Sequence, residues 1–203
     1  METVPGTIGY AQAADRFIDL SESIRFEKLH ELILEFIPTT ESDVLDIGSG
    51  SGRDAAALAR MGHNVTAVEP NSDFIETATR IHPLPNIQWI EDSLPSLSAL
   101  TTTFDFILCH GVWQHIDHTG RIEALVRISE ILNHGGIFAV ALRHGPVGNG
   151  THYFQASADE TITEAARVGL DLVLNIPNQA SALPNKRNVT WTRLAFRRNH
   201  ADV

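Results

Sequence analysis

The most informative run in this 203-residue chain is Asp46-Ile47-Gly48-Ser49-Gly50-Ser51-Gly52-Arg53-Asp54. Residues 44–47 before it read as a short strand, residues 54–61 after it as a helix rich in Ala and Leu, and residues 64–68 as the next strand. Glycines in every second position let a ligand lie against main-chain N–H groups. The following helix presents its positive N-terminus to the same place. The run therefore predicts a βαβ unit with a nucleotide-type ligand cradle at the carboxyl edge of a sheet.

Two ligand classes fit this cradle on spacing alone. Glu69 lies 21 residues after Gly48, where an acid can accept hydrogen bonds from both ribose hydroxyls. Gly50-x-Gly52-x-x-Ala55 also satisfies the dinucleotide fingerprint in its alanine form, which keeps NAD open. The carboxylate of Asp46 would oppose a pyrophosphate and attract an ammonium, and a pair of unit charges at about 4 Å is worth ~4 kcal/mol at an effective dielectric constant of ~20. Charge therefore favours a cationic ligand.

Strand and helix patterns alternate through the rest of the chain. Helices are expected at residues 72–81, 119–132 and 158–168, and strands at 87–90, 104–109, 137–142, 170–176 and 189–196. The alternation predicts an α/β doubly wound fold, a mostly parallel sheet with helices on both faces. The two late strands predict an antiparallel edge. Before the sheet, residues 11–37 carry apolar side chains at spacings of three and four, which predicts one helical run that Pro38 ends.

Composition narrows the class of protein further. The chain has 43% apolar residues, 15 Lys and Arg against 25 Asp and Glu, and one cysteine, Cys109. These values predict one globular domain without an internal disulfide. A net charge of −10 argues against nucleic-acid and membrane-surface partners. No run resembles a secretion signal or a membrane span, so we expect a cytoplasmic protein.

Four motifs in order resemble the class I S-adenosylmethionine-dependent methyltransferases. They are Asp46-x-Gly48-x-Gly50-x-Gly52, Glu69, Asp92-Ser93 and the strand Phe104-Asp105-Phe106-Ile107-Leu108-Cys109-His110, and the resemblance spans roughly residues 42–142. It implies a Rossmann-like sheet of seven strands whose last strand is antiparallel. It also implies one methyltransferase domain over residues 1–203, with 1–38 as a helical lid, 39–145 as the cofactor-binding core and 146–203 as a C-terminal helix and antiparallel strands.

The same resemblance implies where S-adenosylmethionine, and its product S-adenosylhomocysteine, would bind. Asp46 and the loop from Gly48 to Gly52, with Ser49 and Gly50, would hold the methionine end. Glu69 and the adjacent Pro70 would hold the ribose, Asp92 and Ser93 the adenine edge, and His110 with Gly111 the floor beneath the sulfonium. Arg53 and, from the lid, Tyr10 are further candidate contacts.

Catalytic candidates follow the fourth predicted strand. The stretch Gly111-Val112-Trp113-Gln114-His115 is similar to a Glu-Val-Leu-Glu-His stretch of many small-molecule methyltransferases, which places His115 beside the acceptor. An imidazole suits removal of an acceptor proton at neutral pH. His110 is a second candidate, and Trp113 would either wall the acceptor pocket or belong to the core. His110, His115 and His118 lack a matching set of carboxylates or cysteines, so we expect no metal.

The sequence thus predicts a methyltransferase that acts on an oxygen or nitrogen of a small molecule. Arg143 and His144, past the fifth predicted strand, are consistent with an anionic acceptor and equally with scattered surface cations. An NAD-dependent oxidoreductase and a non-catalytic adenosyl-binding module remain as alternatives. Replacement of Asp46 by alanine is expected to weaken cofactor binding.

Overall fold

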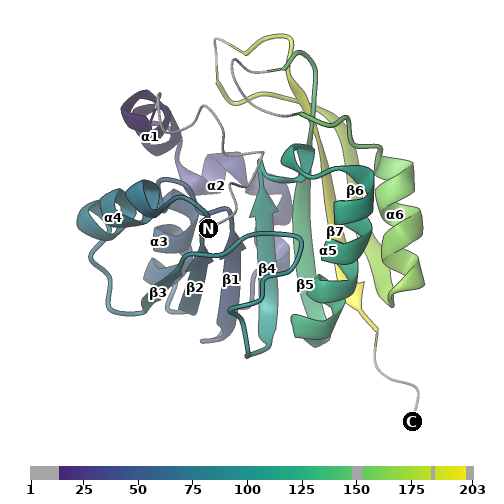
Figure 1. Cartoon of the computed structure of the whole chain (residues 1–203), viewed down its shortest axis with the longest axis horizontal. Helices are drawn as coiled ribbons and strands as arrows, with labels where there is room; N and C mark the ends of the chain where they lie inside the picture. Colours follow the sequence, from purple (N-terminus) through teal and green to yellow (C-terminus); the bar gives the residue numbers. More distant parts are fainter. Residues whose placement is uncertain (1–13, 148–152, 184–185, 200–203) are drawn as a thin grey trace.

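A computed structural model describes residues 14–147, 153–183 and 186–199 of the chain (Figure 1). The helices are α1 (Ala14–Glu22), α2 (Phe26–Leu29), the 3-10 helix η3 (Glu31–Phe36), α3 (Arg53–Arg60), α4 (Ser72–Ile81), the 3-10 helix η4 (Trp113–His115), α5 (His118–Ile131) and α6 (Ala158–Arg167). The strands are β1 (Asp43–Ile47), β2 (Asn64–Val68), β3 (Ile87–Ile90), β4 (Phe104–His110), β5 (Leu132–His144), β6 (Leu170–Ala180) and β7 (Thr190–Arg198). Within those ranges no helix has the length and apolarity needed to cross a membrane.

The strands form one sheet in the order β3-β2-β1-β4-β5-β7-β6. The first five of these pair in parallel, and β7 pairs antiparallel with both β5 and β6. The chain leaves β1 toward β2 on one side, whereas β4 lies on the other side. Such a reversal of strand order opens a crevice at the carboxyl ends of the strands, where α/β proteins bind ligands. The predicted Rossmann-like seven-stranded sheet is confirmed.

Helices flank the sheet on both faces (Figure 1). An apolar cluster lies on each face. Leu45 and Ile47 belong to the cluster that includes residues of α5 and α6. Val44 belongs to the opposite cluster, with residues of α2, η3 and α3. Since side chains alternate along a strand, Asp46 faces the α3 side together with Val44.

The N-terminal residues 11–37 do not form the single helix that their spacing predicts. The described part is divided into α1, α2 and η3. Ser23 donates its hydroxyl to the carbonyl of Leu20 (2.7 Å) and Arg25 is extended (ψ 139°), so α1 ends there. A second break falls at His30 (φ −109°), whose side chain is buried. Periodicity detects the apolar face but not these local breaks.

The end of the sheet also differs from the expected edge. The last strand, β7, is antiparallel as predicted, but it lies between β5 and β6, so the edge strand β6 runs parallel to the first five. In addition, β5 begins at Leu132, directly after α5, with Gly135 (φ +77°) inside the strand. The strand expected at 137–142 is therefore longer and has an irregular start, next to the register shift in its pairing with β4.

Candidate active site

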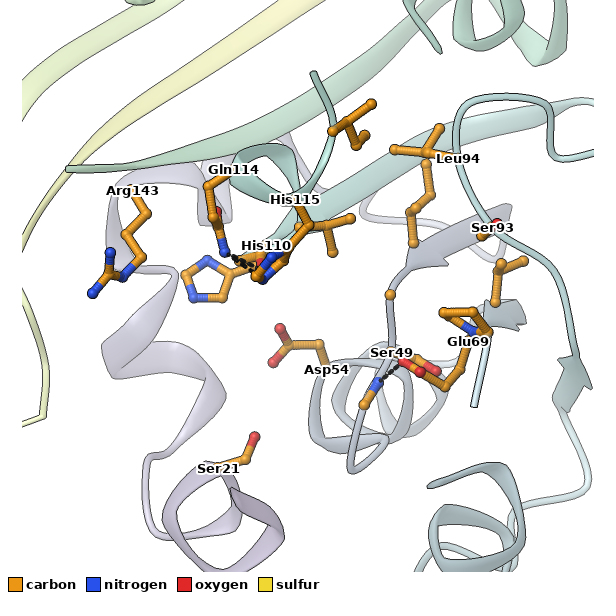
Figure 2. A pocket seen from close by; sticks show the side chains of 18 of the residues that line it. Ser21, Ser49, Asp54, Glu69, Ser93, Leu94, His110, Gln114, His115 and Arg143 are labelled. Carbon is orange, nitrogen blue, oxygen red and sulfur yellow. Dashed lines mark hydrogen bonds between the residues drawn. The ribbon is translucent and has the colours of Figure 1, made fainter. Parts of the chain in front are cut away.

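A cavity of about 770 Å³ opens at the carboxyl ends of β1, β2, β4 and β5 (Figure 2). One end, here called the glycine-loop end, is lined by residues 48–51, 69–70 and 92–95. The other, the histidine end, is lined by residues 110–112, 114–116, 143, 153–154, 181–183, 186 and 191. Small-molecule pockets typically measure roughly 300–1,000 Å³, so this cavity has room for a cofactor-sized ligand.

At two positions of the loop only glycine fits, because φ is positive and a neighbouring side chain occupies the space that a Cβ atom would need. A Cβ atom on Gly48 (φ +71°) would lie 2.2 Å from Cγ2 of Val112, and one on Gly52 (φ +82°) would lie 2.5 Å from the ring of Trp89. The amides of Gly48 and Ser49 both donate to the carbonyl of Val68, at 2.8 and 2.9 Å. The loop is thereby held against the end of β2, and its inner surface stays free of side chains at Gly48 and Gly50.

Asp46 lies behind this loop and does not line the cavity. Its carboxylate is only 2% exposed and accepts a hydrogen bond from the backbone N–H of Ala55, while Oδ2 has no partner among the described residues. Burial, followed by the nearby charge of Asp54, raises its pKa well above the usual range. The expected direct contact between Asp46 and a ligand ammonium stays a prediction.

The carboxylate that does line the cavity beside the loop is Asp54 (Figure 2). Arg53 donates to it through Nε (2.7 Å) and Nη2 (3.0 Å), and Nε2 of His30 lies 2.9 Å from its Oδ2. The charges and hydrogen bonds of His30 and Arg53 outweigh burial and hold the pKa of Asp54 well below its usual range. The sequence indicated a helix-start residue here; the pairing with His30 depends on a contact 24 residues away along the chain.

Glu69 occupies the expected place at the end of β2 and lines the cavity. Its Oε2 accepts from the amide of Gly50 (3.0 Å) and its Oε1 from that of Asn71 (3.1 Å). It is 7% exposed, and burial raises its pKa to about 7 although both amide contacts act in the opposite direction. Pro70, next along the chain, lines the same end.

Asp92 and Ser93 also lie at the glycine-loop end. The carboxylate of Asp92 accepts from the amides of Ser93 (2.7 Å) and Ala99 (2.8 Å). These bonds fix the backbone that follows β3, so Asp92 shapes the cavity wall. An adenine contact by these two residues stays a prediction.

His110 is fixed by a cation at the histidine end of the cavity. Nη1 of Arg193 donates to its Nδ1 (2.7 Å), and its ring stacks on Trp191 with centroids 5.0 Å apart. Burial, then Arg193 and His30, lower its pKa well below the usual range. Because a guanidinium only donates, the lone pair of Nδ1 is engaged and the proton of the neutral ring lies on Nε2. His110 is therefore built to donate a hydrogen bond, not to take up a proton.

His115 comes from η4 and meets Gln114 in the cavity wall (Figure 2). Nε2 of Gln114 donates to the carbonyl of Gly111 (2.5 Å) and lies 3.1 Å from Nε2 of His115. The Gly111 carbonyl requires the amide nitrogen on that side, so His115 Nε2 is the acceptor of the second contact. The structure brings His110, Gly111 and His115 together at one end of the cavity, as expected.

Trp113 does not take the pocket role considered for it. It is fully buried, absent from the cavity wall, and packs on Phe138 with centroids 6.0 Å apart. In η4 the side chains of successive residues point in different directions, so Trp113 enters the core while its neighbours Gln114 and His115 line the cavity. It is a core residue.

Helix α1 lies over the glycine loop. A ring carbon of Phe17 would be 3.2 Å from a Cβ on Gly50, and Nη1 of Arg53 donates to the carbonyl of Ser21 (3.0 Å). Ser51 donates to Glu22 (2.6 Å). These contacts attach α1 to the loop; Tyr10 lies outside the described residues, and a lid function of residues 1–38 stays a prediction.

Comparisons with known proteins agree with this geometry. A family model described as a methyltransferase domain matches residues 44–136, the part that carries the glycine loop, Glu69 and η4. This match fits a class I S-adenosylmethionine-dependent methyltransferase.

Relatives of the chain come from several organisms. It is 33% identical over 107 residues to the mitochondrial ubiquinone biosynthesis O-methyltransferase of Schizosaccharomyces pombe, covering 50% of this chain and 39% of that protein. It is 32% identical over 117 residues to the ubiquinone biosynthesis O-methyltransferase of Albidiferax ferrireducens, covering 53% and 46%. The chain thus spans less than half the length of these two relatives.

A solved structure supports the fold of the chain over nearly its whole length. The crystal structure of a TehB-like SAM-dependent methyltransferase from Corynebacterium glutamicum aligns with a TM-score of 0.69 and 23% sequence identity. The alignment covers 93% of this chain and 97% of the other. It covers more of the chain than the family model, which ends at residue 136.

The residues present fit the cofactor of this methyltransferase family. Gly48, Ser49 and Gly50 line the cavity, and Oγ of Ser49 is buried without a partner among the described residues. Two carboxylates, Asp54 and Glu69, line the cavity on either side of the loop. An adenosyl ligand with an ammonium group supplies donors for such acceptors.

Glu69 is expected to make cofactor binding depend on pH. Its pKa of about 7 means that it is largely protonated below pH 7 in the ligand-free protein. Ribose hydroxyls that donate to it favour the ionised form, so binding should release a proton and affinity for S-adenosylhomocysteine should rise on the order of tenfold from about pH 5.5 to about pH 7.5. Isothermal titration calorimetry in buffers of different ionisation enthalpy measures both quantities.

Two variants isolate this effect. Glu69→Gln should bind more weakly and lose the pH dependence, whereas Glu76→Gln, an exposed carboxylate on α4, should keep it. In the ligand-free protein the pKa of Glu69 exceeds the ordinary glutamate value of 4.5, so Glu69 lowers the free energy of unfolding as pH rises from about 4.5 to about 7. An affinity that is flat across this range in the wild type would contradict the role of Glu69.

Proposed function

We propose that the protein transfers the methyl group of S-adenosylmethionine to an oxygen or nitrogen atom of a small molecule. The observation that carries the proposal is one cavity that joins the glycine loop and Glu69 at one end to His115 and Gln114 at the other. A cofactor held at the first end and an acceptor at the second would share the space between them. The ubiquinone biosynthesis relatives are named O-methyltransferases, which supports an oxygen acceptor.

Cofactor residues in this proposal follow from the cavity wall. The loop from Gly48 to Gly52 and Ser49 would hold the methionine portion, with Asp54 as the carboxylate nearest its ammonium. Glu69 would accept from the ribose, and Asp92 and Ser93 would border the adenine. Gly111 and the donor Nε2–H of His110 would face the sulfur from the end of β4.

The bound cofactor supplies a methyl carbon made electrophilic by a positive sulfur. The chain would supply alignment, because holding two reacting groups in near-attack geometry is worth ~7 to 11 kcal/mol. α1, attached to the loop by Arg53 and Ser51, would exclude water from above. His115 would take the acceptor proton at Nε2, where the acceptor hydroxyl replaces the contact from Gln114.

Thermal shift tests the cofactor half of the proposal. S-adenosylhomocysteine at 100 times its Kd should add ~2.7 kcal/mol to the free energy of unfolding, which for this size raises Tm by about 5 to 11 °C. NAD should produce no comparable shift, since the ionised carboxylate of Asp54 lines the cavity beside the glycine loop and would oppose a pyrophosphate. A shift with NAD and none with S-adenosylhomocysteine would favour an oxidoreductase.

A turnover assay tests the second part of the proposal, methyl transfer to a small-molecule acceptor. Labelled S-adenosylmethionine offered with a panel of acidic and phenolic metabolites should give labelled product with some members, and silence over a broad panel would favour a binding module without catalysis. The proposal includes no nucleic-acid or membrane partner, in keeping with a net charge of −10. A cytoplasmic location is also part of it, and cell fractionation would test that.

A further inference from the structure

Arg143 is a buried cation whose bonding is incomplete. It lies at the end of β5, is 8% exposed, and lines the histidine end of the cavity (Figure 2). Its Nη2 donates to the carbonyl of Pro146 (2.7 Å), but Nη1 is buried with no hydrogen-bond partner among the described residues. An unmet buried donor on a charged group is costly, so such a group usually has a partner in the working state.

The other two buried arginines among the described residues have complete hydrogen bonding at their terminal nitrogens. Arg121 uses its three nitrogens on the carbonyls of Trp113, Gln155 and Phe154. Arg193 uses its two terminal nitrogens on His110 and the carbonyl of Leu29. Both arginines therefore have a partner for each terminal nitrogen. Arg143 differs because its free nitrogen belongs to a residue of the cavity wall.

The surroundings of Arg143 concentrate positive charge. Lys186 lines the same end of the cavity, and burial together with the charge of Arg143 lowers its pKa. Within the described ranges no carboxylate forms an ion pair with either residue. Two cations are thus directed to one place in a protein whose net charge is −10. A local positive field of this kind attracts anions.

The side chains around these two cations indicate the chemistry of the non-anionic part of the ligand. The Arg143 guanidinium lies over the ring of Tyr153, 5.3 Å from its centroid, which occupies its face and leaves the edge with Nη1 for an in-plane acceptor. Trp191, Phe154 and Leu183 add apolar surface at the same end. A planar oxyanion on an apolar body matches this combination.

We propose that the histidine end binds an oxyanion of the methyl acceptor, a carboxylate or phosphate group, through Arg143 with Lys186 at the rim. The inference rests on the proposed function, because it assigns this end to the acceptor. It makes the substrate class a small anionic molecule with an apolar or aromatic body. The oxyanion would anchor the molecule while its nucleophilic atom points toward the cofactor.

Calorimetry on the protein saturated with S-adenosylhomocysteine tests this site with defined probes. Benzoate and phenyl phosphate offer the two oxyanions on the same ring, and benzamide is the neutral control. Benzoate, phenyl phosphate or both should bind, and benzamide should bind at least about tenfold more weakly. The stronger of the two acids identifies the oxyanion. Equal binding of benzamide, or no binding of either acid, would overturn the proposal.

Variants locate the site. Arg143→Gln should weaken the preferred acid about 10- to 100-fold, as expected for a charge-assisted hydrogen bond. Lys186→Gln should weaken it a few-fold, whereas Arg187→Gln, an exposed neighbour outside the cavity wall, should leave it unchanged. Wild-type affinity in Arg143→Gln would refute the site. If that variant fails to fold, wild-type affinity in Lys186→Gln would refute it.

The thermal shift with S-adenosylhomocysteine separates this inference from the proposed function. Arg143→Gln should keep the wild-type shift, because Arg143 lies at the opposite end from the glycine loop. If the wild type itself shows no shift, the proposed function fails. If the shift is normal and the acids do not discriminate, only the anionic acceptor site fails.

Discussion

Replacement of Gly48 by alanine should greatly weaken binding of the cofactor product S-adenosylhomocysteine. The new Cβ would lie 2.2 Å from Cγ2 of Val112, and the residue would keep φ near +71°, a conformation that costs a non-glycine residue about 1–3 kcal/mol. Either the loop or Val112 must move, and displacements of about 1 Å in a positioned site cost on the order of 100-fold. We expect a loss of affinity for S-adenosylhomocysteine of that order, measured by calorimetry.

A matched glycine separates conformational strain from the contact. Gly62 also has a positive φ (+97°), but a Cβ there meets nothing within 4 Å, and it lies outside the cavity wall. Gly62→Ala should therefore lower Tm without changing affinity. The double variant Gly48→Ala/Val112→Ala removes the colliding methyl group and should recover part of the binding. Full affinity in Gly48→Ala alone would mean that the loop does not hold the cofactor.

Local patterns explain which parts of the fold could be predicted from the sequence. The strands at 64–68 and 87–90 and the helix at 72–81 match in both ends, since their periodicity, glycines and prolines act over a few residues. The order of β6 and β7 could not be derived from periodicity, because it depends on which strand pairs with β5. The resemblance to a family supplied the antiparallel last strand.

In the candidate site, too, the sequence predicted local features but not contacts between residues that are distant along the chain. The glycine loop and Glu69 were found because their spacing is local. The partner of His110 is Arg193, 83 residues later, and the partner of Asp54 is His30 on a different element. Asp46 drew attention as the first acid of the motif, yet strand alternation turns it toward α3, and Asp54 lines the cavity instead. No pattern within the run distinguishes these two carboxylates.

The two histidines of the cavity should have separate roles. A proton on Nδ1 of His110 would be opposed by the guanidinium of Arg193 at 2.7 Å, which agrees with the lowered pKa of this ring. The contact of His115 with the neutral amide of Gln114, at 3.1 Å, carries no such opposition and can be exchanged for a substrate hydroxyl. Proton uptake is thus disfavoured at His110, which leaves His115 as the candidate base among the described histidines of the cavity wall.

Replacement of His115 by alanine should accordingly lower kcat about 10²- to 10⁴-fold, the usual contribution of a positioned general base. The Kd for S-adenosylhomocysteine should stay within about threefold, because His115 lies at the histidine end while the glycine loop is unchanged. His118→Ala is the matched control, since His118 is exposed at the start of α5 and outside this cavity. Single-turnover kinetics with the best acceptor from the panel measures the chemical step directly. Near-normal kcat in His115→Ala, with a large loss in His110→Ala, would reverse the two roles and make the Arg193-bound ring the group that acts on the acceptor.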